Sequence, residues 1–253
     1  MNIQICAETR IGSRTANEDS YLIIQGPDLP DGVLAVLAVA DGIGGMGNGH
    51  VASSTALTTF AETFRRFAAA HKRRDPPIAD WLAFCFHKAN SRVLRMGLAL
   101  PELKGMGTAC TAAAITRSHV HVCHVGDGRG YLWREYALRQ LTDDEWYRDL
   151  RKPRPPDKAV HNARPGRRPG VTLVNQAIGW QPMINPSKIV EPLRPGDGIL
   201  LCTDGLTDSL PIEEIERLLR STPGAGDLCR DLADQAAKTP NSDNVTLIYA
   251  QLP

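Results

Sequence analysis

The sequence lacks the cysteine spacing of a metal-binding or redox motif. Its six cysteines contain no Cys-x-x-Cys pair, and all six stand among apolar residues. Cysteines in apolar surroundings behave as small buried hydrophobes, and free thiols persist where the compartment is reducing. The sequence therefore favours six buried free cysteines over a disulfide framework or a zinc site.

Long apolar runs are also missing. The longest uninterrupted one covers residues 33–40, which is eight residues, whereas a membrane-spanning helix needs about 20. The first ten residues contain neither the basic n-region nor the apolar h-region of a signal peptide. We therefore expect no membrane association and a cytoplasmic location.

No charge of one sign dominates. The 29 Lys and Arg against 28 Asp and Glu give a net charge of +1, which predicts no nucleic-acid partner. Residues 148–169 depart from this balance with eight Lys or Arg, two Asp and five Pro. That segment carries +6, so the remainder carries +1 minus +6, or −5. Its prolines predict a long loop. It is either a solvated insertion or a basic flap that draws anionic substrates toward an acidic centre.

Length and apolar content fit one large domain over residues 1–253. With 42% apolar residues, the chain can bury a full core. Alternating or continuous short apolar runs predict strands, and apolar residues spaced by three and four predict amphipathic helices. The expected strands are 21–24, 33–40, 108–116, 120–125, 130–134, 137–141, 198–203 and 245–252. Helices are expected after Gly49, after Pro77, around Ile212 and over 228–237.

These elements predict an α+β fold. Strands dominate the middle of the chain, with one helical pair early and another late. The short connections between the middle strands indicate an antiparallel meander. Two antiparallel sheets packed face to face, each covered by a helix pair, would bury every apolar face. We therefore expect a four-layer α-β-β-α sandwich.

Five aspartates stand at the ends of strand-like segments. They are Asp19, Asp41, Asp127, Asp204 and Asp243. Strands disfavour Asp, and carboxylates gathered at strand ends repel one another unless cations bind them. Oxygen-only ligands are those preferred by hard cations. The pattern therefore indicates a site for several metal ions.

The glycine run after Asp41 supports a second hypothesis. Residues 42–47 match G-x-G-x-x-G, follow a strand and precede a helix, as in dinucleotide-binding proteins. Asp41 would lie close to the pyrophosphate, however, and the expected helix leads into another helix instead of a parallel strand. Glu62, the acidic residue at a suitable separation, lies within that helix. The glycines more readily allow the backbone to approach a metal ion, with the Gly42 carbonyl as a ligand.

Seven motifs occur in one order along nearly the whole chain. They are Arg14-x-x-Asn-Glu-Asp19, Ala40-Asp-Gly-Ile-Gly-Gly45, Gly107-Thr108, Val125-Gly-Asp-Gly-Arg129, Gln176-Ala-Ile-Gly179, Leu201-Cys-Thr-Asp-Gly-Leu-Thr-Asp208 and Asp243-Asn244. In this order they resemble the metal-dependent Ser/Thr protein phosphatases of the type 2C class, in particular bacterial members. The α-β-β-α sandwich of that family agrees with the fold expected above.

The resemblance implies a role for each matching residue. Two Mn²⁺ or Mg²⁺ ions would be bound by Asp19, Asp41, Gly42, Asp204 and Asp243, with Asp41 bridging both. Arg14 would bind the phosphoryl oxygens through its planar fork, and Glu18 would orient water at the ions. Asp127 would hold a third ion together with Asp204 and Asp208. As single residues, Asp127 fits a turn and Asp208 a helix N-cap equally well.

Three positions depart from the family pattern. Ile43 stands where some members, notably animal ones, have a His proposed as the general acid. Gly128 replaces the usual Ser of Gly-Asp-Ser-Arg. The usual Thr-x-Asp-His appears as Thr142-Asp-Asp144-Glu145, without the His. Substrate approach is therefore expected to differ from that of relatives.

The hypothesis is a phosphatase that hydrolyses phosphoserine or phosphothreonine by direct attack of water bridging the two ions. Phosphorylated proteins would be its substrates, and a bacterial Ser/Thr kinase would be its counterpart. Three alternatives stay open: a phosphatase-fold binding or regulatory module with little activity, a dinucleotide-binding oxidoreductase, and a phosphatase for small phosphoesters. The oligomeric state is not readable from the sequence.

Overall fold

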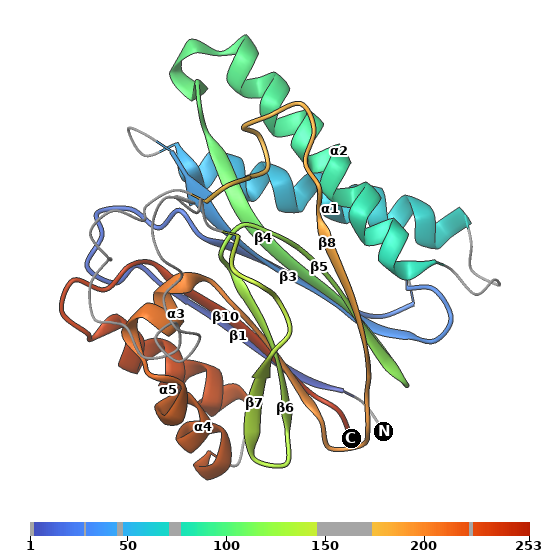
Figure 1. Cartoon of the computed structure of the whole chain (residues 1–253), viewed down its shortest axis with the longest axis vertical. Coiled ribbons are helices and arrows are strands. Elements are labelled where there is room, and N and C mark those ends of the chain that lie inside the picture. The colour runs from blue at the N-terminus through green and yellow to red at the C-terminus, as the bar shows by residue number, and fades with distance from the viewer. Residues whose placement is uncertain (1–2, 28, 45–47, 71–76, 146–173, 223–224) are drawn as a thin grey trace, which may run out of the picture.

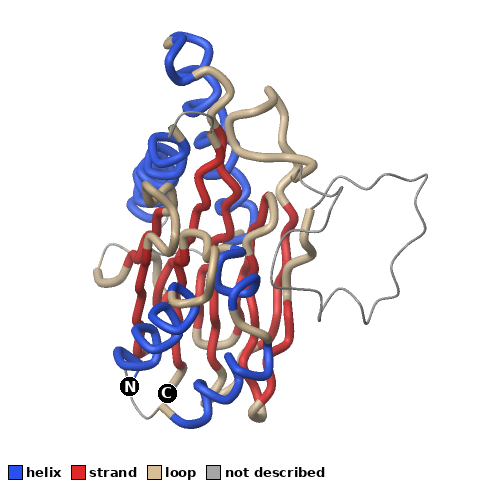
Figure 2. The backbone as a smooth tube through the Cα atoms, turned by 90° about the vertical axis from the view of Figure 1, so that its left-hand side faces the viewer, coloured by secondary structure: helices blue, strands red, loops and turns tan. Residues whose placement is uncertain are grey.

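Two five-stranded antiparallel sheets face each other in the computed structural model (Figure 1), which describes residues 3–27, 29–44, 48–70, 77–145, 174–222 and 225–253. The first sheet has the order β1-β10-β9-β6-β7 and the second β2-β3-β4-β5-β8. Helices α1 and α2 cover the second sheet, and the C-terminal helices lie against the first (Figures 1 and 2). The expected α-β-β-α sandwich is confirmed.

The strands have the following bounds. They are β1 (Gln4–Arg10), β2 (Ser20–Ile24), β3 (Val33–Ile43), β4 (Gly107–Thr116), β5 (His119–Val125), β6 (Arg129–Arg134), β7 (Ala137–Gln140), β8 (Ser187–Pro192), β9 (Gly198–Cys202) and β10 (Val245–Gln251). The helices are α1 (Gly49–Ala70), α2 (Ile78–Ala99), the short 3-10 helix η2 (Pro101–Leu103), α3 (Asp204–Ser209), α4 (Ile212–Ser221) and α5 (Ala225–Ala237). The basic segment 148–169 lies outside the described residues, so neither interpretation of it is decided.

Three apolar layers hold the sandwich together. One lies between the sheets and includes Leu37, Val122 and Ile248. A second, rich in Phe, fills the space between α1, α2 and the sheet beneath them. The third lies under α4 and α5. Because both faces of the central strands are buried, these strands are continuously apolar instead of alternating.

The predicted antiparallel meander of the middle strands is confirmed for its two hairpins, β4–β5 and β6–β7, and is wrong between them. β5 pairs with β4 and β8, whereas β6 pairs with β7 and β9 in the opposite sheet. The chain changes sheets in the short turn 126–128, where Gly126 adopts a φ of +107° that favours glycine. The sheet change places Asp127 at the end of the sandwich, between the two sheets. A short connection was therefore a poor guide to strand pairing here.

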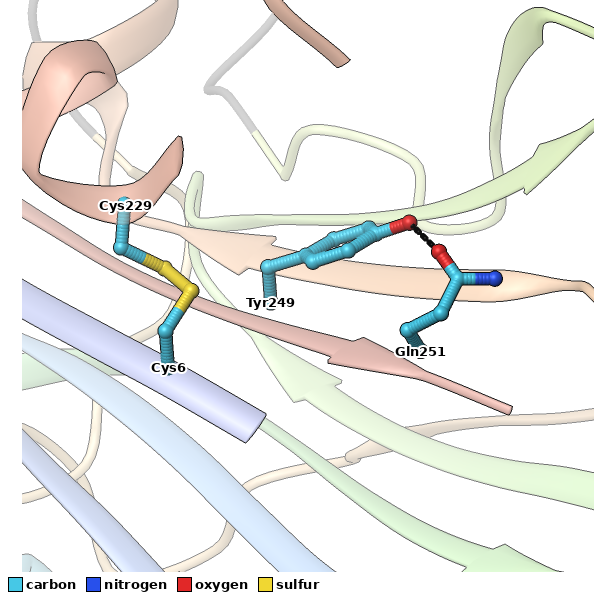
Figure 3. Close-up of a disulfide and its surroundings, with 4 residues drawn as sticks. All are labelled: Cys6, Cys229, Tyr249 and Gln251. Atoms are coloured by element: carbon cyan, nitrogen blue, oxygen red, sulfur yellow. Dashed lines mark hydrogen bonds between the residues drawn. A yellow bond between two sulfur atoms is a disulfide. The ribbon is translucent and has the colours of Figure 1, made fainter. Parts of the chain in front are cut away.

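The interpretation of all six cysteines as free is also wrong. Cys6 of β1 and Cys229 of α5 form a disulfide, with their Cα atoms 6.0 Å apart (Figure 3). The other four cysteines are free and buried, as expected. The bonded pair is separated by 223 positions, so no spacing rule reveals it. Disulfides are rare in reducing compartments, and the bond therefore does not favour the predicted cytoplasmic location.

Reduction of this disulfide should destabilise the fold. The bond joins the first strand to the last helix, so it restricts the unfolded chain over nearly its full length. Native disulfides of this kind typically contribute about 2–4 kcal/mol. Guanidinium unfolding with and without a phosphine reductant measures the difference. The Cys6→Ser/Cys229→Ser variant should match the reduced protein and be insensitive to reductant; equal midpoints for oxidised and reduced wild type would contradict the expectation.

Candidate metal and phosphate site

Six aspartates interact electrostatically at one end of the two sheets. Asp41 lies near the end of β3, Asp19 precedes β2, and Asp243 precedes β10. The pKa of Asp41 is raised well above its ordinary value by burial and by the charges of Asp19, Asp204, Asp127 and Asp243. Burial likewise raises the pKa of Asp204, with contributions from Asp127, Asp208, Asp243 and Asp19. The structure thus brings together all the predicted aspartates from both sheets.

Asp19 links the two halves of the site. Its Oδ2 accepts a hydrogen bond from Thr203 Oγ1 at 2.8 Å, and the same hydroxyl oxygen accepts one from the Thr246 backbone N–H. Asp19 belongs to the β2 side, whereas Thr203 follows β9 of the other sheet. Burial raises the pKa of Asp19 to about 7. Its carboxylate is therefore held across the junction between the sheets.

Two carboxylate oxygens in this cluster have no hydrogen-bond partner among the described residues. They are Asp19 Oδ1 and Asp204 Oδ1, and both are buried. A buried polar atom without a partner is costly and needs an explanation. Both oxygens belong to hard donors, which suit Mg²⁺ or Mn²⁺. The residues present therefore fit a divalent cation, although no three Asp, Glu, His or Cys side chains of the described residues converge tightly enough to hold one as they stand.

Gly42 brings the backbone of β3 close to the first turn of α1. A Cβ at Gly42 would lie 2.2 Å from the Gly49 carbonyl oxygen and 2.6 Å from that of Glu18. Both neighbouring atoms are backbone, so no side chain could move aside. The expected glycine requirement is therefore explained by close approach of two backbone segments. The role of the Gly42 carbonyl as a metal ligand stays a prediction.

Glu18 is bonded to the start of α1. Its Oε1 accepts a hydrogen bond from the Gly49 N–H at 2.8 Å, and its backbone carbonyl accepts one from Ser53 Oγ at 2.6 Å. An acidic side chain here satisfies a free N–H of the helix and complements its dipole. Glu18 thus caps α1 at the edge of the site, and its predicted role toward water stays a prediction.

Arg14 forms an ion pair with Asp243. Its Nη2 donates to Asp243 Oδ2, while Asp243 Oδ1 accepts from the Asn244 N–H at 2.8 Å. The Arg14 side chain is half exposed, so its guanidinium is open to solvent. The predicted phosphate-binding residue and a predicted metal ligand are therefore direct neighbours, with Arg14 supplying positive charge to the acidic cluster.

Asn244 is a positioning residue whose role the sequence did not reveal. Its amide Nδ2 donates to the carbonyls of Ile11 and Ala16, and its Oδ1 accepts from the Glu18 N–H. These three bonds fasten the loop that carries Arg14, Glu18 and Asp19 onto the start of β10. The only signal in the sequence was the Asp243-Asn244 dipeptide before a strand. A buried side-chain amide whose hydrogen-bonding groups all have partners fixes the relative position of the segments that it joins.

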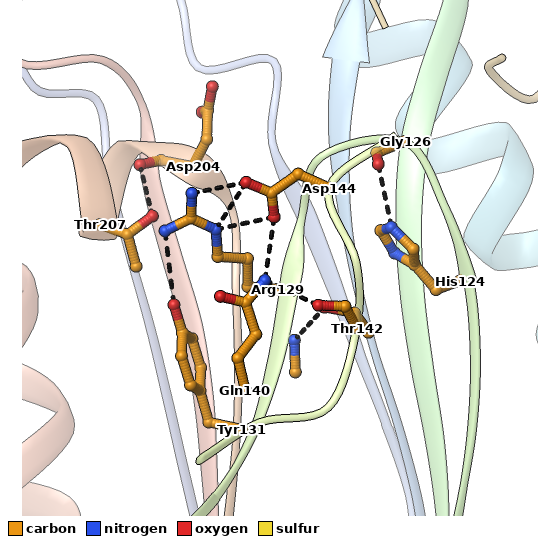
Figure 4. A network of polar contacts seen from close by, with 10 residues as sticks. His124, Gly126, Arg129, Tyr131, Gln140, Thr142, Asp144, Asp204 and Thr207 are labelled. Carbon is orange, nitrogen blue, oxygen red and sulfur yellow. Dashed lines mark hydrogen bonds and ion pairs between the residues drawn. The ribbon is translucent and has the colours of Figure 1, made fainter. Parts of the chain in front are cut away.

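Arg129 and Asp144 form a buried, bidentate ion pair (Figure 4). Arg129 Nε donates to Asp144 Oδ1 at 2.9 Å, and Nη2 donates to Oδ2 at 2.6 Å. Gln140 Nε2 also donates to Asp144 Oδ1. The two side chains are only 15% and 8% exposed. Burial raises the pKa of Asp127 to about 6, and the charge of Asp144 is the next largest cause.

Comparison with known proteins agrees with this geometry. The family model described as Protein phosphatase 2C matches residues 8–239. The chain belongs to the protein phosphatase 2C family. It is 28% identical over 240 residues to "Serine/threonine phosphatase stp" of Listeria monocytogenes, covering 94% of this chain and 91% of that protein. It is 31% identical over 246 residues to "Serine/threonine protein phosphatase PstP" of Mycobacterium tuberculosis, covering 94% of this chain and 43% of that protein.

Solved phosphatase structures share the whole fold. The crystal structure of Mycobacterium tuberculosis PstP/Ppp superposes with a TM-score of 0.82 at 28% identity, covering 100% of this chain and 99% of that one. The catalytic domain of PstP in complex with two manganese ions gives a TM-score of 0.79 at 28% identity, covering 99% and 98%. The protein is therefore a metal-dependent Ser/Thr phosphatase of the 2C class that acts on phosphoproteins. None of the described helices combines the length and the apolar character that crossing a membrane requires.

The departures of this phosphatase from its family have structural counterparts. Glu145, where a His is usual, accepts hydrogen bonds from the Gly126 N–H at 3.0 Å and from Gln176 Nε2 at 2.8 Å. It thereby supports the turn that carries Asp127. A Cβ at Gly128 would lie 3.0 Å from Thr111 Oγ1.

The dinucleotide hypothesis is not supported, because β3 pairs only with antiparallel neighbours and α1 leads into α2.

Gly205→Ala should disable this phosphatase through a backbone collision. A Cβ at Gly205 would lie 1.9 Å from the Asn244 carbonyl oxygen, which would push α3, and Asp204 with it, away from Asp243. Overpacking of this kind lowers the free energy of unfolding by about 1–3 kcal/mol or more. Because a displacement of about 1 Å can cost a large factor in rate, we expect kcat to fall at least about tenfold. Denaturant unfolding and phosphatase assays measure both effects.

Gly226→Ala is the matched control. This glycine lies in α5, where an added Cβ would meet nothing within 4 Å. Alanine favours a helix over glycine by up to about 1 kcal/mol, so the control should be as active as wild type and at least as stable. If Gly205→Ala and Gly226→Ala had the same stability and the same kcat, the expected effect of displacing α3 would be refuted.

Proposed function

We propose that the protein hydrolyses phosphoserine and phosphothreonine in proteins with two divalent cations bound by Asp19, Asp41, Asp204, Asp243 and the Gly42 carbonyl. The observation that carries this proposal is the pair of buried oxygens on Asp19 and Asp204 that no group of the described residues bonds, within a cluster of carboxylates from both sheets. When bound, such cations lower the pKa of water between them and stabilise charge that develops on the phosphoryl group.

The chain's own groups orient the reaction. Thr203 holds Asp19 in place through its hydroxyl, and Asn244 fastens the loop that carries Arg14. Arg14 can exchange Asp243 for the phosphoryl oxygens of a substrate, because its guanidinium is half exposed and its fork can bind two oxygens at once. Ile43 lies where some relatives have a His, so no described side chain at that position supplies a proton to the leaving group.

Two finer assignments belong to the same proposal. Asp127, Asp204 and Asp208 would hold a third, weaker ion, because the charge of Asp208 raises the pKa of Asp127, and both of these residues raise the pKa of Asp204. Asp204 and Asp208 are four residues apart on α3 and so share one face of it. A Ser/Thr kinase that phosphorylates the same proteins would be the physiological counterpart.

Metal-dependent turnover tests the proposal. Purified protein is assayed with a phosphothreonine peptide and with para-nitrophenyl phosphate, in Mn²⁺, in Mg²⁺ and in EDTA. Hydrolysis of both substrates with either cation, and none in EDTA, is the expected result. Cation binding by folded protein without turnover would instead identify a binding or regulatory module. Hydrolysis of the small ester alone would indicate a phosphatase for small phosphoesters.

A further inference from the structure

An open groove follows the seam between α1 and α2, on the side of the helix pair that faces away from the sheet. It has a volume of about 660 Å³. Its residues are Ser54, Thr55, Thr58, Thr59, Glu62, Thr63, Arg66, Phe67, Phe84, Lys88, Arg92, Arg95 and Met96. Five are hydroxyl-bearing, four are basic and one is acidic. The groove is thus a polar channel with a charge of +3, from four positive charges minus one.

The basic side chains of α2 form one row. Lys88, Arg92 and Arg95 follow one another at intervals of four and three residues, so they project from the same side of the helix. All three are exposed, as is Arg66 on the facing helix. None of these four pairs with a carboxylate of the described residues. Elsewhere on the surface, by contrast, Arg217, Arg220 and Arg230 are each paired within their own helix.

The remaining lining residues suit an extended peptide. The hydroxyls of α1 line one wall from Ser54 to Thr63. Ser54 and Thr63 donate to carbonyls of their own helix, so their oxygens face the groove as acceptors for peptide N–H groups. At the far end, the Phe84 ring packs edge-on against Phe67 at 5.1 Å, and Lys88 Nζ lies 5.0 Å from the Phe84 ring centroid. A flat lipid surface or a nucleic-acid duplex would leave a concave channel of this kind unfilled, whereas an acidic chain segment fits both its shape and its charge.

The groove begins near the proposed site. Gly49, the first residue of α1, contacts Gly42 and Glu18. At 1.5 Å per residue, Ser54 lies about 7.5 Å and Arg66 about 25 Å farther along the helix axis. An extended peptide covers about 3.3–3.6 Å per residue. Measured from Gly49, these distances correspond to about two to eight residues of extended peptide, so residues that far from a phosphorylated residue at the site would lie in the groove.

We propose that the α1–α2 groove is a docking site for an acidic segment of the phosphoprotein substrate, lying about two to eight residues from the phosphorylated residue. The inference rests on the proposed function, because it concerns which phosphoproteins the site accepts. Lys88, Arg92, Arg95 and Arg66 would attract the acidic side chains, and the hydroxyls of α1 would bond the peptide backbone.

Peptide kinetics test the proposal. Three kinds of phosphothreonine peptide are compared, which carry four Glu, four Ala or four Lys at positions four to seven residues from the phosphothreonine. These four residues are placed on the N-terminal side in one version and on the C-terminal side in the other. The enzymes are wild type, Lys88→Gln/Arg92→Gln/Arg95→Gln, and the control Arg194→Gln/Arg217→Gln/Arg230→Gln, which removes the same charge from exposed arginines elsewhere. The measured quantity is kcat/KM for each peptide divided by kcat/KM for para-nitrophenyl phosphate.

For the Glu peptide whose acidic residues lie on the side that reaches the groove, this ratio should be about tenfold lower in the groove variant than in wild type, mainly because KM rises. For the Ala peptide the ratio should change little. The control variant should keep the wild-type ratio. An equal loss in both variants would mean general electrostatic attraction, and no loss in either would mean that the groove does not dock substrate; both results overturn the proposal.

A binding measurement separates this proposal from the proposed function. Fluorescence anisotropy of an unphosphorylated Glu-rich peptide needs no turnover. Wild type should bind it more tightly than the groove variant, whether or not hydrolysis is observed. Absence of hydrolysis with every cation would refute the proposed function alone. Preferential binding of phosphatidylserine vesicles or of single-stranded RNA, lost in the groove variant, would assign the groove to another class of partner and overturn the proposal.

Discussion

Asp41→Asn and Asp204→Asn should each lower kcat in Mn²⁺ by about a thousandfold or more while the protein stays folded. Both carboxylates lie at the centre of the cluster and interact with at least four other aspartates. Loss of a cation that stabilises the reacting charge removes several kcal/mol of transition-state stabilisation, and about 4 kcal/mol corresponds to about a thousandfold in rate. The measurement is initial-rate hydrolysis of a phosphothreonine peptide across a range of Mn²⁺ concentrations.

Stability distinguishes this loss from simple misfolding. Burial and neighbouring charges raise the pKa of both carboxyls, so keeping either group ionised costs folding free energy when no cation is bound. In EDTA, therefore, the Asn variants should be as stable as wild type or more stable. The stabilisation that Mn²⁺ gives wild type should be reduced in both variants.

Asp227→Asn is the matched control, because this carboxylate is exposed on α5 and pairs only with Arg230 among the described residues. It should keep wild-type turnover and the wild-type response to Mn²⁺. Substantial turnover by Asp41→Asn at saturating Mn²⁺ would refute the assignment of Asp41 as a ligand of the reacting centre.

The aspartate cluster was predictable because its signal is local. Each residue stands beside an apolar strand or a glycine in a short motif, and strand ends on one side of a sandwich meet in space. The central strands were predictable for a similar reason, since burial on both faces makes them continuously apolar. Short-range sequence patterns and burial therefore account for the predictions of the aspartate cluster and the central strands.

The features that the sequence did not show depend on long-range pairing. β1 and β8 are edge strands whose residues are mostly half-buried or exposed, so they lack a strong apolar pattern. The change of sheet between β5 and β6 depends on which strand is free to pair, which no local window contains. The Cys6–Cys229 bond and the ion pair of Arg14 with Asp243 join residues more than 220 positions apart.

Several fasteners position the site across the junction of the sheets. Thr203 and Asp19 join β9 to the β2 side, Asn244 joins β10 to the loop before β2, and Gly205 allows α3 to contact the Asn244 carbonyl. Thr203, Asn244 and Gly205 are neutral, whereas Asp19 and the other groups that they position are charged. Hydroxyl and amide groups can therefore hold the carboxylates close together without adding to their repulsion.

Asp144→Ala should be among the most destabilising single changes outside the proposed ligands. The substitution leaves the Arg129 guanidinium buried without its bidentate partner, and Gln140 loses an acceptor as well. Breaking a buried ion pair from one side costs about 3–5 kcal/mol, mostly from the charge left unpaired. Removing both charges in Arg129→Met/Asp144→Ala should therefore recover part of the loss. Guanidinium unfolding of metal-free wild type, Asp144→Ala and the double variant measures the three free energies of unfolding. Glu214→Ala, which breaks the exposed ion pair with Arg217, is the control and should change stability little. A double variant no more stable than Asp144→Ala would show that the lost contacts of Asp144, and not the unpaired charge of Arg129, dominate the energetics at this end of the sandwich.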